Sequence, residues 1–183
     1  EDTGNRSTAI GAGALATQNN DASNYNVAVG YNAGTAVTTG LENTIIGGLA
    51  GDALTTALGN TVLGMKALST DTTGRYSVAI GHGALENQAF TGNNEVFNVA
   101  VGYQAGNDIT TGVYNTLIGG KSGDSLTTGI GNVGVGLNTL ATEDAHGLNT
   151  AVGTDVLQTL NAGADAYNVA VGCLLYTSPS PRD

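Results

Sequence analysis

The chain has little of what most folded domains use to hold themselves together. Its 183 residues include one Cys, two Pro, no Trp, seven Tyr and two Phe. Cys173, Pro179 and Pro181 all lie in the last eleven residues, so residues 1–172 contain neither Cys nor Pro. A disulfide framework is therefore excluded, and the redox compartment cannot be inferred from cysteine usage.

Basic residues and long apolar runs are also scarce. Five Lys and Arg against fifteen Asp and Glu give a net charge of −10, which argues against a nucleic-acid partner or an anionic membrane surface. No apolar run approaches the roughly 20 residues of a membrane-spanning helix, so we expect no direct membrane insertion of this segment. The chain begins with Glu1 rather than Met, and we expect it to be a fragment.

Glycine, by contrast, is abundant, and its placement is periodic. A motif of Asn, three small, β-branched or aliphatic residues and Gly recurs ten times at intervals of 17 to 21 residues. Such a Gly content alone would fit a low-complexity chain, but the fixed positions of the β-branched residues indicate an ordered repeat. The motif glycines are Gly11, Gly30, Gly47, Gly64, Gly81, Gly102, Gly119, Gly136, Gly153 and Gly172.

The residue four positions before each motif Gly is Asn in eight copies and Ser in two. We predict that these Asn side chains form a structural ladder, bonded to each other and to turn backbone. A second period of 72 residues, seen where GGLAGDAL at Gly47 returns as GGKSGDSL at Gly119, divides the chain into two four-repeat units, about 26–97 and 98–167. The ladder residues are Asn26, Asn43, Asn60, Asn98, Asn115, Asn132, Asn149 and Asn168.

The repeat predicts an all-β fold, a β-solenoid with about ten rungs of 17–21 residues. Helical-hairpin repeats need more than about 30 residues, whereas a few β-branched residues followed by Gly are typical of a short strand and a turn. Rungs stacked at about 4.8 Å would form a rod of roughly 43 Å. We predict one repeat domain over residues 1–172.

The predicted strand is apolar on both faces. The residue before the motif Gly is always Ile, Val or Leu, and the residue before that is Ala in six of ten copies and polar in none. We expect the larger aliphatic residues to fill the interior and the Ala face to contact another copy, because so short a rung leaves little chain to cover a second apolar face. Three-fold packing is expected, although the pattern does not separate three chains from two.

Several segments carry a family resemblance. NTAVG, NVAVGYQAG and SVAIGHGAL resemble the YadA-like head repeats of trimeric autotransporter adhesins, and the arrangement of TTG, NTxIG and AL is similar to repeats of bacteriophage tail-fibre shafts. The resemblance covers residues 1–172. It implies a left-handed parallel β-roll, a homotrimer, an extracellular place on a bacterial surface or phage virion, and a role in spacing or presenting receptor binding. The rungs are longer than the common adhesin repeat, so both settings stay open.

The last eleven residues do not continue the repeat. CLLYTSPSPRD resembles the translation of a transposon-end adaptor used in sequencing libraries. We interpret residues 173–183 as a non-native tail and expect the natural protein to continue past Gly172.

Residues suited to catalysis or metal binding are sparse. His82 and His146 have no Cys or paired carboxylate beside them, and Asp52 and Asp124 lie 72 residues apart, so no neighbouring rung completes the six or more oxygens that calcium needs. We expect no enzyme activity, cofactor or metal. The alternative is a monomeric ligand- or ice-binding β-solenoid, although we interpret the repeated Thr pairs, such as 38–39, as turn-stabilising ladders.

Three longer rungs contain candidate contact loops. Their extra residues come just before the NVAVG copies and end in an aromatic residue. Exposed loops with amides and aromatics could contact a cell-surface glycan or a protein receptor; packing on the rod edge is the alternative. The candidate residues are Tyr25, Phe90, Phe97 and Tyr167.

Overall fold

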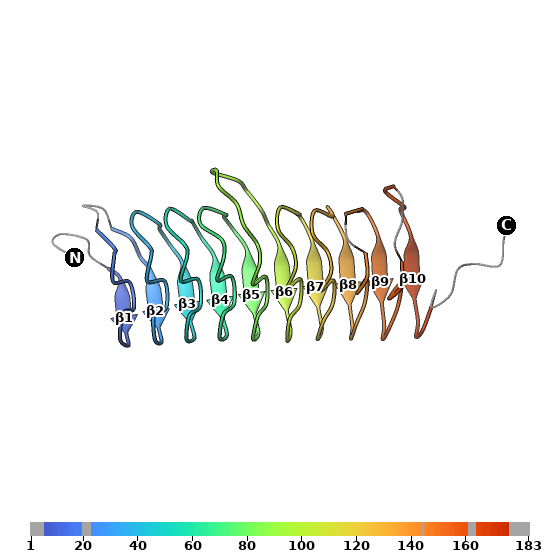
Figure 1. The fold of residues 1–183 in the computed structure, drawn as a ribbon, viewed down its shortest axis with the longest axis horizontal. Helices are drawn as coiled ribbons and strands as arrows, with labels where there is room; N and C mark the ends of the chain where they lie inside the picture. The colour runs from blue at the N-terminus through green and yellow to red at the C-terminus, as the bar shows by residue number, and fades with distance from the viewer. Residues whose placement is uncertain (1–5, 20–22, 144, 161–163, 176–183) are drawn as a thin grey trace.

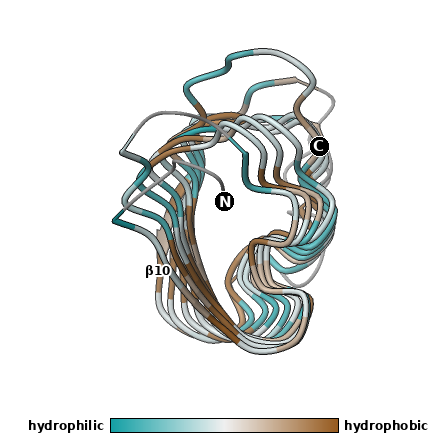
Figure 2. Ribbon diagram, turned by 90° about the vertical axis from the view of Figure 1, so that its left-hand side faces the viewer, coloured by the Kyte–Doolittle hydropathy of each residue, from teal (hydrophilic) through white to brown (hydrophobic). Residues whose placement is uncertain are grey.

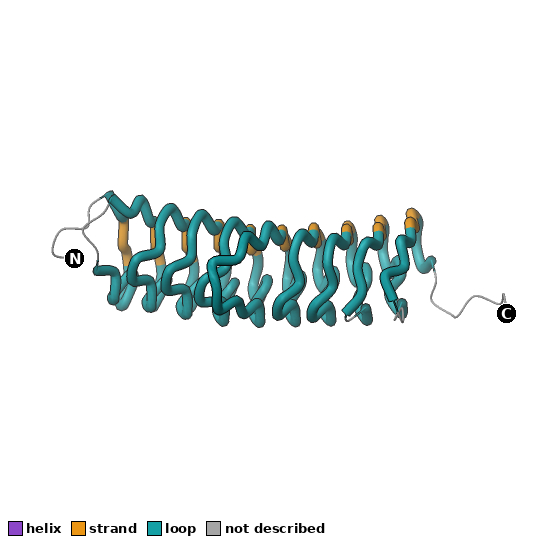
Figure 3. The backbone as a smooth tube through the Cα atoms, turned by 90° about the horizontal axis from the view of Figure 1, so that it is seen from above, coloured by secondary structure: helices purple, strands orange, loops and turns teal. Residues whose placement is uncertain are grey.

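The computed structural model describes residues 6–19, 23–143, 145–160 and 164–175. Ten parallel strands of three residues form one sheet in chain order, so the predicted β-solenoid is confirmed. Figure 1 shows the strands side by side along a rod, and Figure 3 shows the turns and loops that complete each rung. The strands are β1 (Thr8–Ile10), β2 (Val27–Val29), β3 (Thr44–Ile46), β4 (Thr61–Leu63), β5 (Val78–Ile80), β6 (Val99–Val101), β7 (Thr116–Ile118), β8 (Val133–Val135), β9 (Thr150–Val152) and β10 (Val169–Val171).

Backbone hydrogen bonds connect neighbouring rungs over most of the chain outside the strands as well. Asn32 N donates to the carbonyl of Ala12 at 2.8 Å, and Gly34 N donates to the carbonyl of Ala50 at 3.0 Å. Because turn and strand share the same rung spacing, the structure is a continuous stack rather than a sheet with loops attached. The described residues include no helix, and hence none long and apolar enough to cross a membrane.

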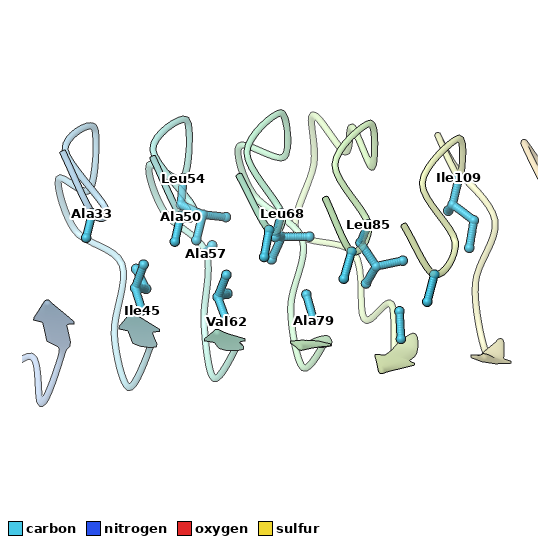
Figure 4. Packing of buried hydrophobic residues seen from close by; sticks show 14 of the residues in the cluster. Ala33, Ile45, Ala50, Leu54, Ala57, Val62, Leu68, Ala79, Leu85 and Ile109 are labelled. Carbon is cyan, nitrogen blue, oxygen red and sulfur yellow. The ribbon is translucent and has the colours of Figure 1, made fainter. Parts of the chain in front are cut away.

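The middle residue of each strand from β2 to β10 is buried inside the solenoid, which overturns the expected assignment of faces. Ala28, Ile45, Ala100 and Leu117 are fully buried, while the first and third residues of their strands face outward. The reason is volume: a rung of about 17 residues encloses a narrow interior. An Ala on the strand leaves room for the Leu and Ile side chains that come from the opposite wall (Figure 4).

Among the described residues, the buried apolar side chains form two clusters that are divided in the rung of β8. Gly134 stands there in the middle strand position, and a Cβ at Gly134 would lie 2.5 Å from Ser122 Oγ and 2.7 Å from Thr139 Oγ1. The two hydroxyls are hydrogen-bonded to each other at 2.7 Å, and Ser122 Oγ also donates to the Gly134 carbonyl. These mutual bonds satisfy two buried hydroxyls, and they separate the interior into two apolar clusters.

The predicted Asn ladder is confirmed. Asn115 is typical: its backbone N–H donates to Asn98 Oδ1 at 2.9 Å, and its Nδ2 donates to Asn98 Oδ1 at 3.3 Å and to the Gly129 carbonyl at 2.8 Å. Its own Oδ1 accepts from the backbone N–H of Asn132 at 2.9 Å. Each Asn therefore joins two rungs and ties the turn to the strand, which explains why the position repeats.

Where the ladder has Ser, a Gln from the following longer rung completes it. Gln88 Nε2 donates to Ser77 Oγ at 3.3 Å, and Asn98 Nδ2 donates to Gln88 Oε1 at 3.0 Å. Gln18 makes the same two contacts with Ser7 and Asn26. Both arrangements lie where a longer rung begins, so the Ser–Gln pair accommodates the extra residues without breaking the ladder.

We expect Asn115→Ala to cost about 2 to 4 kcal/mol of unfolding free energy. The variant leaves the buried N–H of Asn132 without its acceptor and removes the donor to Gly129. Denaturant unfolding followed by far-UV circular dichroism measures the loss. Asn87→Ala is the control, because Asn87 is exposed and its side chain bonds to the side chains of Asn107 and Asp108 rather than to the ladder; it should stay within about 0.5 kcal/mol of wild type. Equal stability of the two variants would contradict the ladder's role.

The C-terminal residues that the structure describes do not leave the stack at Gly172. Leu174 N donates to the Thr154 carbonyl at 3.0 Å, and Leu157 N donates to the Leu175 carbonyl at 2.9 Å. The first three residues of the segment interpreted as a tail thus follow the path of a rung. Residues 176–183 lie outside the described residues.

Candidate functional site

The outward side of the sheet is an apolar surface that runs the length of the rod. We call it the outer strand face and define it as the first and third residues of strands β1 to β10. The third position is aliphatic throughout, and Leu63 and Ile118 there are 44% and 40% exposed. In the end-on view of Figure 2, the strand side of the molecule carries a continuous hydrophobic band. A contiguous apolar patch of this extent makes the outer strand face the candidate interaction surface of the chain.

One edge of the outer strand face carries an aromatic stack. The residues Tyr76, Phe97 and Tyr114 come from three successive rungs. Each directly precedes one ladder position. The ring centroids of Tyr76 and Phe97 are 5.3 Å apart with an angle of 16° between planes, and those of Phe97 and Tyr114 are 6.0 Å apart at 17°. All three have positive φ, between 51° and 62°. This left-handed backbone turns each ring outward while the next residue points in.

The other edge lies just beyond the motif glycines. Tyr31, Met65, Tyr103 and Leu137 each follow such a Gly and are exposed. His82 occupies the same position one rung before Tyr103, and their rings meet at 5.7 Å. The outer strand face therefore has large apolar side chains along both edges, not only on the strands themselves.

Three of the four predicted loop contacts are exposed, and one is not. Tyr25, Phe97 and Tyr167 all precede a ladder Asn and are exposed, and Arg6 stacks on the Tyr25 ring at 5.4 Å. Phe90 is only 6% exposed, so its assignment as a surface contact is wrong. Its N–H donates to the buried carboxylate of Asp71, and its carbonyl accepts from Thr72 and Thr73, so Phe90 anchors the long rung.

The long rungs are only partly described. The segment between β5 and β6 projects beyond the neighbouring turns in Figure 1. Residues 20–22 and 161–163 of the two other long rungs lie outside the described residues. The Thr pairs act as expected within the turns, since Thr55 Oγ1 donates to the Thr72 carbonyl at 2.9 Å and Thr110 Oγ1 to the Thr127 carbonyl at 3.1 Å.

The edge residues Tyr76, Tyr114, Tyr31 and Tyr103 were missed by reasoning from the sequence. The signal was present: when the rungs are aligned on the motif Gly, aromatic residues recur immediately before the ladder position and immediately after the Gly. The longer rungs alone do not reveal the pattern, because Tyr76 and Tyr114 are each the last residue of a 17-residue rung. Alignment by rung position would have found both columns.

The carboxylates of the turns show no sign of a shared ion site. Burial raises the pKa of Asp52 above its ordinary value, against the opposing effects of its own backbone N–H and Lys66. Burial likewise raises the pKa of Asp124, which Lys121 lowers and Asp108 raises. Within the described ranges, no three His, Cys, Asp or Glu side chains cluster closely enough to hold a metal ion.

No family model matches the chain, and neither a curated protein nor a solved structure matches it.

Proposed function

We propose that the chain is a structural and adhesive segment of a homotrimeric fibre, which spaces or presents a receptor-binding part outside the cell, on a bacterial surface or a phage virion. The observation that carries the proposal is the outer strand face. It keeps aliphatic side chains partly exposed and in register on rung after rung. A monomer would have to keep this band in water, whereas a second and third copy would cover it.

The size of the outer strand face fits a stable contact. Nine rung intervals give a length of about 43 Å, and the seven positions that include both edges give a width of about 20 Å. The product, on the order of 850 Å², is close to the roughly 800 Å² that each partner contributes to a standard protein–protein interface.

The two edges favour three copies over two. In a two-fold dimer the same patch on each copy meets itself, while in a three-fold assembly each copy contacts two neighbours with two different surfaces. Stacked aromatics along one edge and Tyr103, Met65 and Leu137 along the other supply two distinct apolar surfaces. The resemblance of the repeats to YadA-like heads and phage fibre shafts points the same way.

The solution mass of the chain tests the proposal. Multi-angle light scattering in reducing buffer, which keeps the exposed Cys173 from cross-linking copies, should give three times the chain mass of 18.1 kDa. A folded monomer would contradict the proposal.

A monomer would favour the second candidate, an ice- or ligand-binding solenoid. The observation behind it is that the first strand position is always Thr or Val, so that short side chains stack in register from rung to rung, as in Thr44, Thr61, Val78 and Val99. Thermal hysteresis of the monomer would test ice binding directly.

A further inference from the structure

A groove runs along the turn side of the rod over the rungs of β2 to β5, apart from the outer strand face. It encloses about 460 Å³. Thr39 and Thr56 occupy equivalent positions one rung apart, and Leu41, Leu58 and Arg75 form a column of parallel bridges. The sixth lining residue, Asn93, comes from the long rung between β5 and β6. The groove is therefore complete within one chain.

Arg75 has no side-chain partner in this groove. Its backbone is fixed, since Arg75 N donates to the Asn94 carbonyl and the Arg75 carbonyl accepts from Val96 N, both at 3.1 Å. Its buried Nε has no hydrogen-bond acceptor among the described residues. The other basic residues that the structure describes each contact a side chain: Lys66 with Glu86, Lys121 with Asp124 and Arg6 with Tyr25.

The second four-rung unit shows that the fold does not need this arginine. Seventy-two residues after Arg75, at the equivalent place in the second unit, stands Gly147. There the Asp165 carboxylate accepts a hydrogen bond from Gly147 N at 2.9 Å. The stack therefore forms in the second unit with Gly at the place of Arg75, so holding the rungs together does not account for this cation.

We infer that the Arg75 groove binds the carboxylate of an acidic saccharide of the uronic-acid type. A guanidinium presents parallel N–H donors that match a carboxylate. The Thr39 and Thr56 hydroxyls and the Asn93 amide can bond to sugar hydroxyls, and Leu58 offers an apolar surface to the C–H groups of the ring. A polyanion such as nucleic acid is disfavoured by the net charge of −10.

This inference rests on the proposed function only for its setting, as the ligand class of an adhesive fibre. The groove residues do not overlap the outer strand face or its edges. If the chain is a trimer that does not bind the sugar, only the inference about the groove is wrong. If the chain is a monomer that binds the sugar, only the proposed trimer is wrong.

The test compares methyl β-glucuronide with methyl β-glucoside, which differ only in a carboxylate replacing a hydroxymethyl group. The full chain, labelled with ¹⁵N, is titrated while the Nε–H signal of Arg75 is followed by NMR. We expect a saturable shift with the glucuronide and binding at least about tenfold weaker with the glucoside, as the loss of charge-assisted hydrogen bonds predicts.

Two variants complete the test. Arg75→Gly reproduces the second unit and should abolish saturable glucuronide binding, observed through the amide signals of Thr39 and Thr56. Lys121→Gln removes a cation that already pairs with Asp124, and it should leave binding unchanged. Glu95→Gln should tighten binding, because Glu95 follows Arg75 in the same column of bridges and its charge repels an anion.

Several results would overturn the inference. They are the absence of saturable binding, equal affinity for the two sugars, or tighter binding of methyl glucoside 6-sulfate, which would assign the groove to sulfate esters. A lower solution mass for Arg75→Gly would also overturn it, because the partner of Arg75 would then be a carboxylate of another copy.

Discussion

A chain carrying both Leu63→Asp and Ile118→Asp is expected to be a folded monomer, with about one third of the wild-type solution mass. Both residues occupy the third strand position, in β4 and β7, and point outward. In a single chain the new carboxylates would stay in water and cost little. In a trimer they would be buried in an apolar contact, where an unpaired charge costs several kcal/mol, and symmetry would bring like charges together.

The control for this variant is Ile130→Asp. Ile130 is 49% exposed, slightly more than either target, but it lies two residues before the ladder Asn132, off the outer strand face. Its substitution makes the same chemical change, so it should leave the solution mass unaltered. If the double variant keeps the wild-type mass while Ile130→Asp lowers it, the contact between copies lies on the turn side of the rod.

Leu63 and Ile118 are chosen because the structure shows that the third strand position, not the middle one, points outward. Ala100, the middle residue of β6, would have been the target under the expectation that the Ala face meets another copy. It is fully buried inside the solenoid, so Ala100→Asp would place a charge among apolar side chains and disrupt the fold. A change in mass would then report unfolding rather than loss of a contact.

The sequence predicted what depends on repetition. The rung length, the strand positions and the Asn ladder all followed from it, because a side chain that bonds to its own counterpart one rung away must recur at that interval. Asn43 and Asn60 show this directly, each donating to the Oδ1 of the Asn before it. A contact between equivalent residues of neighbouring rungs repeats at a fixed interval along the chain, so the sequence spacing is enough to reveal it.

The sequence could not predict what depends on enclosed volume or on an irregular path. Both faces of the strand are apolar, and only the closed rung shows that its interior accepts Ala rather than Val and Ile at most strand positions. Phe90 is buried because Asp71 draws its backbone inward. Arg75 is unusual because Asn93 returns beside it. Neither contact belongs to the repeat, so no alignment of rungs would place it.

The largest loss of stability is expected for a substitution of Gly47, which is followed directly by a second glycine, Gly48. Gly47, the motif Gly of β3, has φ of +137°, and a Cβ there would lie 2.5 Å from the Gly64 carbonyl oxygen and 2.7 Å from its carbon. Both atoms are backbone of the next rung, held by Gly64 N donating to the Ile46 carbonyl at 2.8 Å. Gly47→Ala must separate two rungs, so we expect a cost of roughly 3 to 5 kcal/mol.

Gly48→Ala provides the matched comparison one residue away. A Cβ at Gly48 meets nothing within 4 Å, so this variant should be neutral or up to about 1 kcal/mol more stable, because Ala lowers the entropy of the unfolded chain. Thermal and denaturant unfolding of both variants measure the difference. Equal stabilities would show that neighbouring rungs can move apart at the Gly corner. A large difference would mean that the close approach of the glycine backbones sets the rung spacing, and with it the spacing of the outer strand face that a partner copy would match in the proposed trimer.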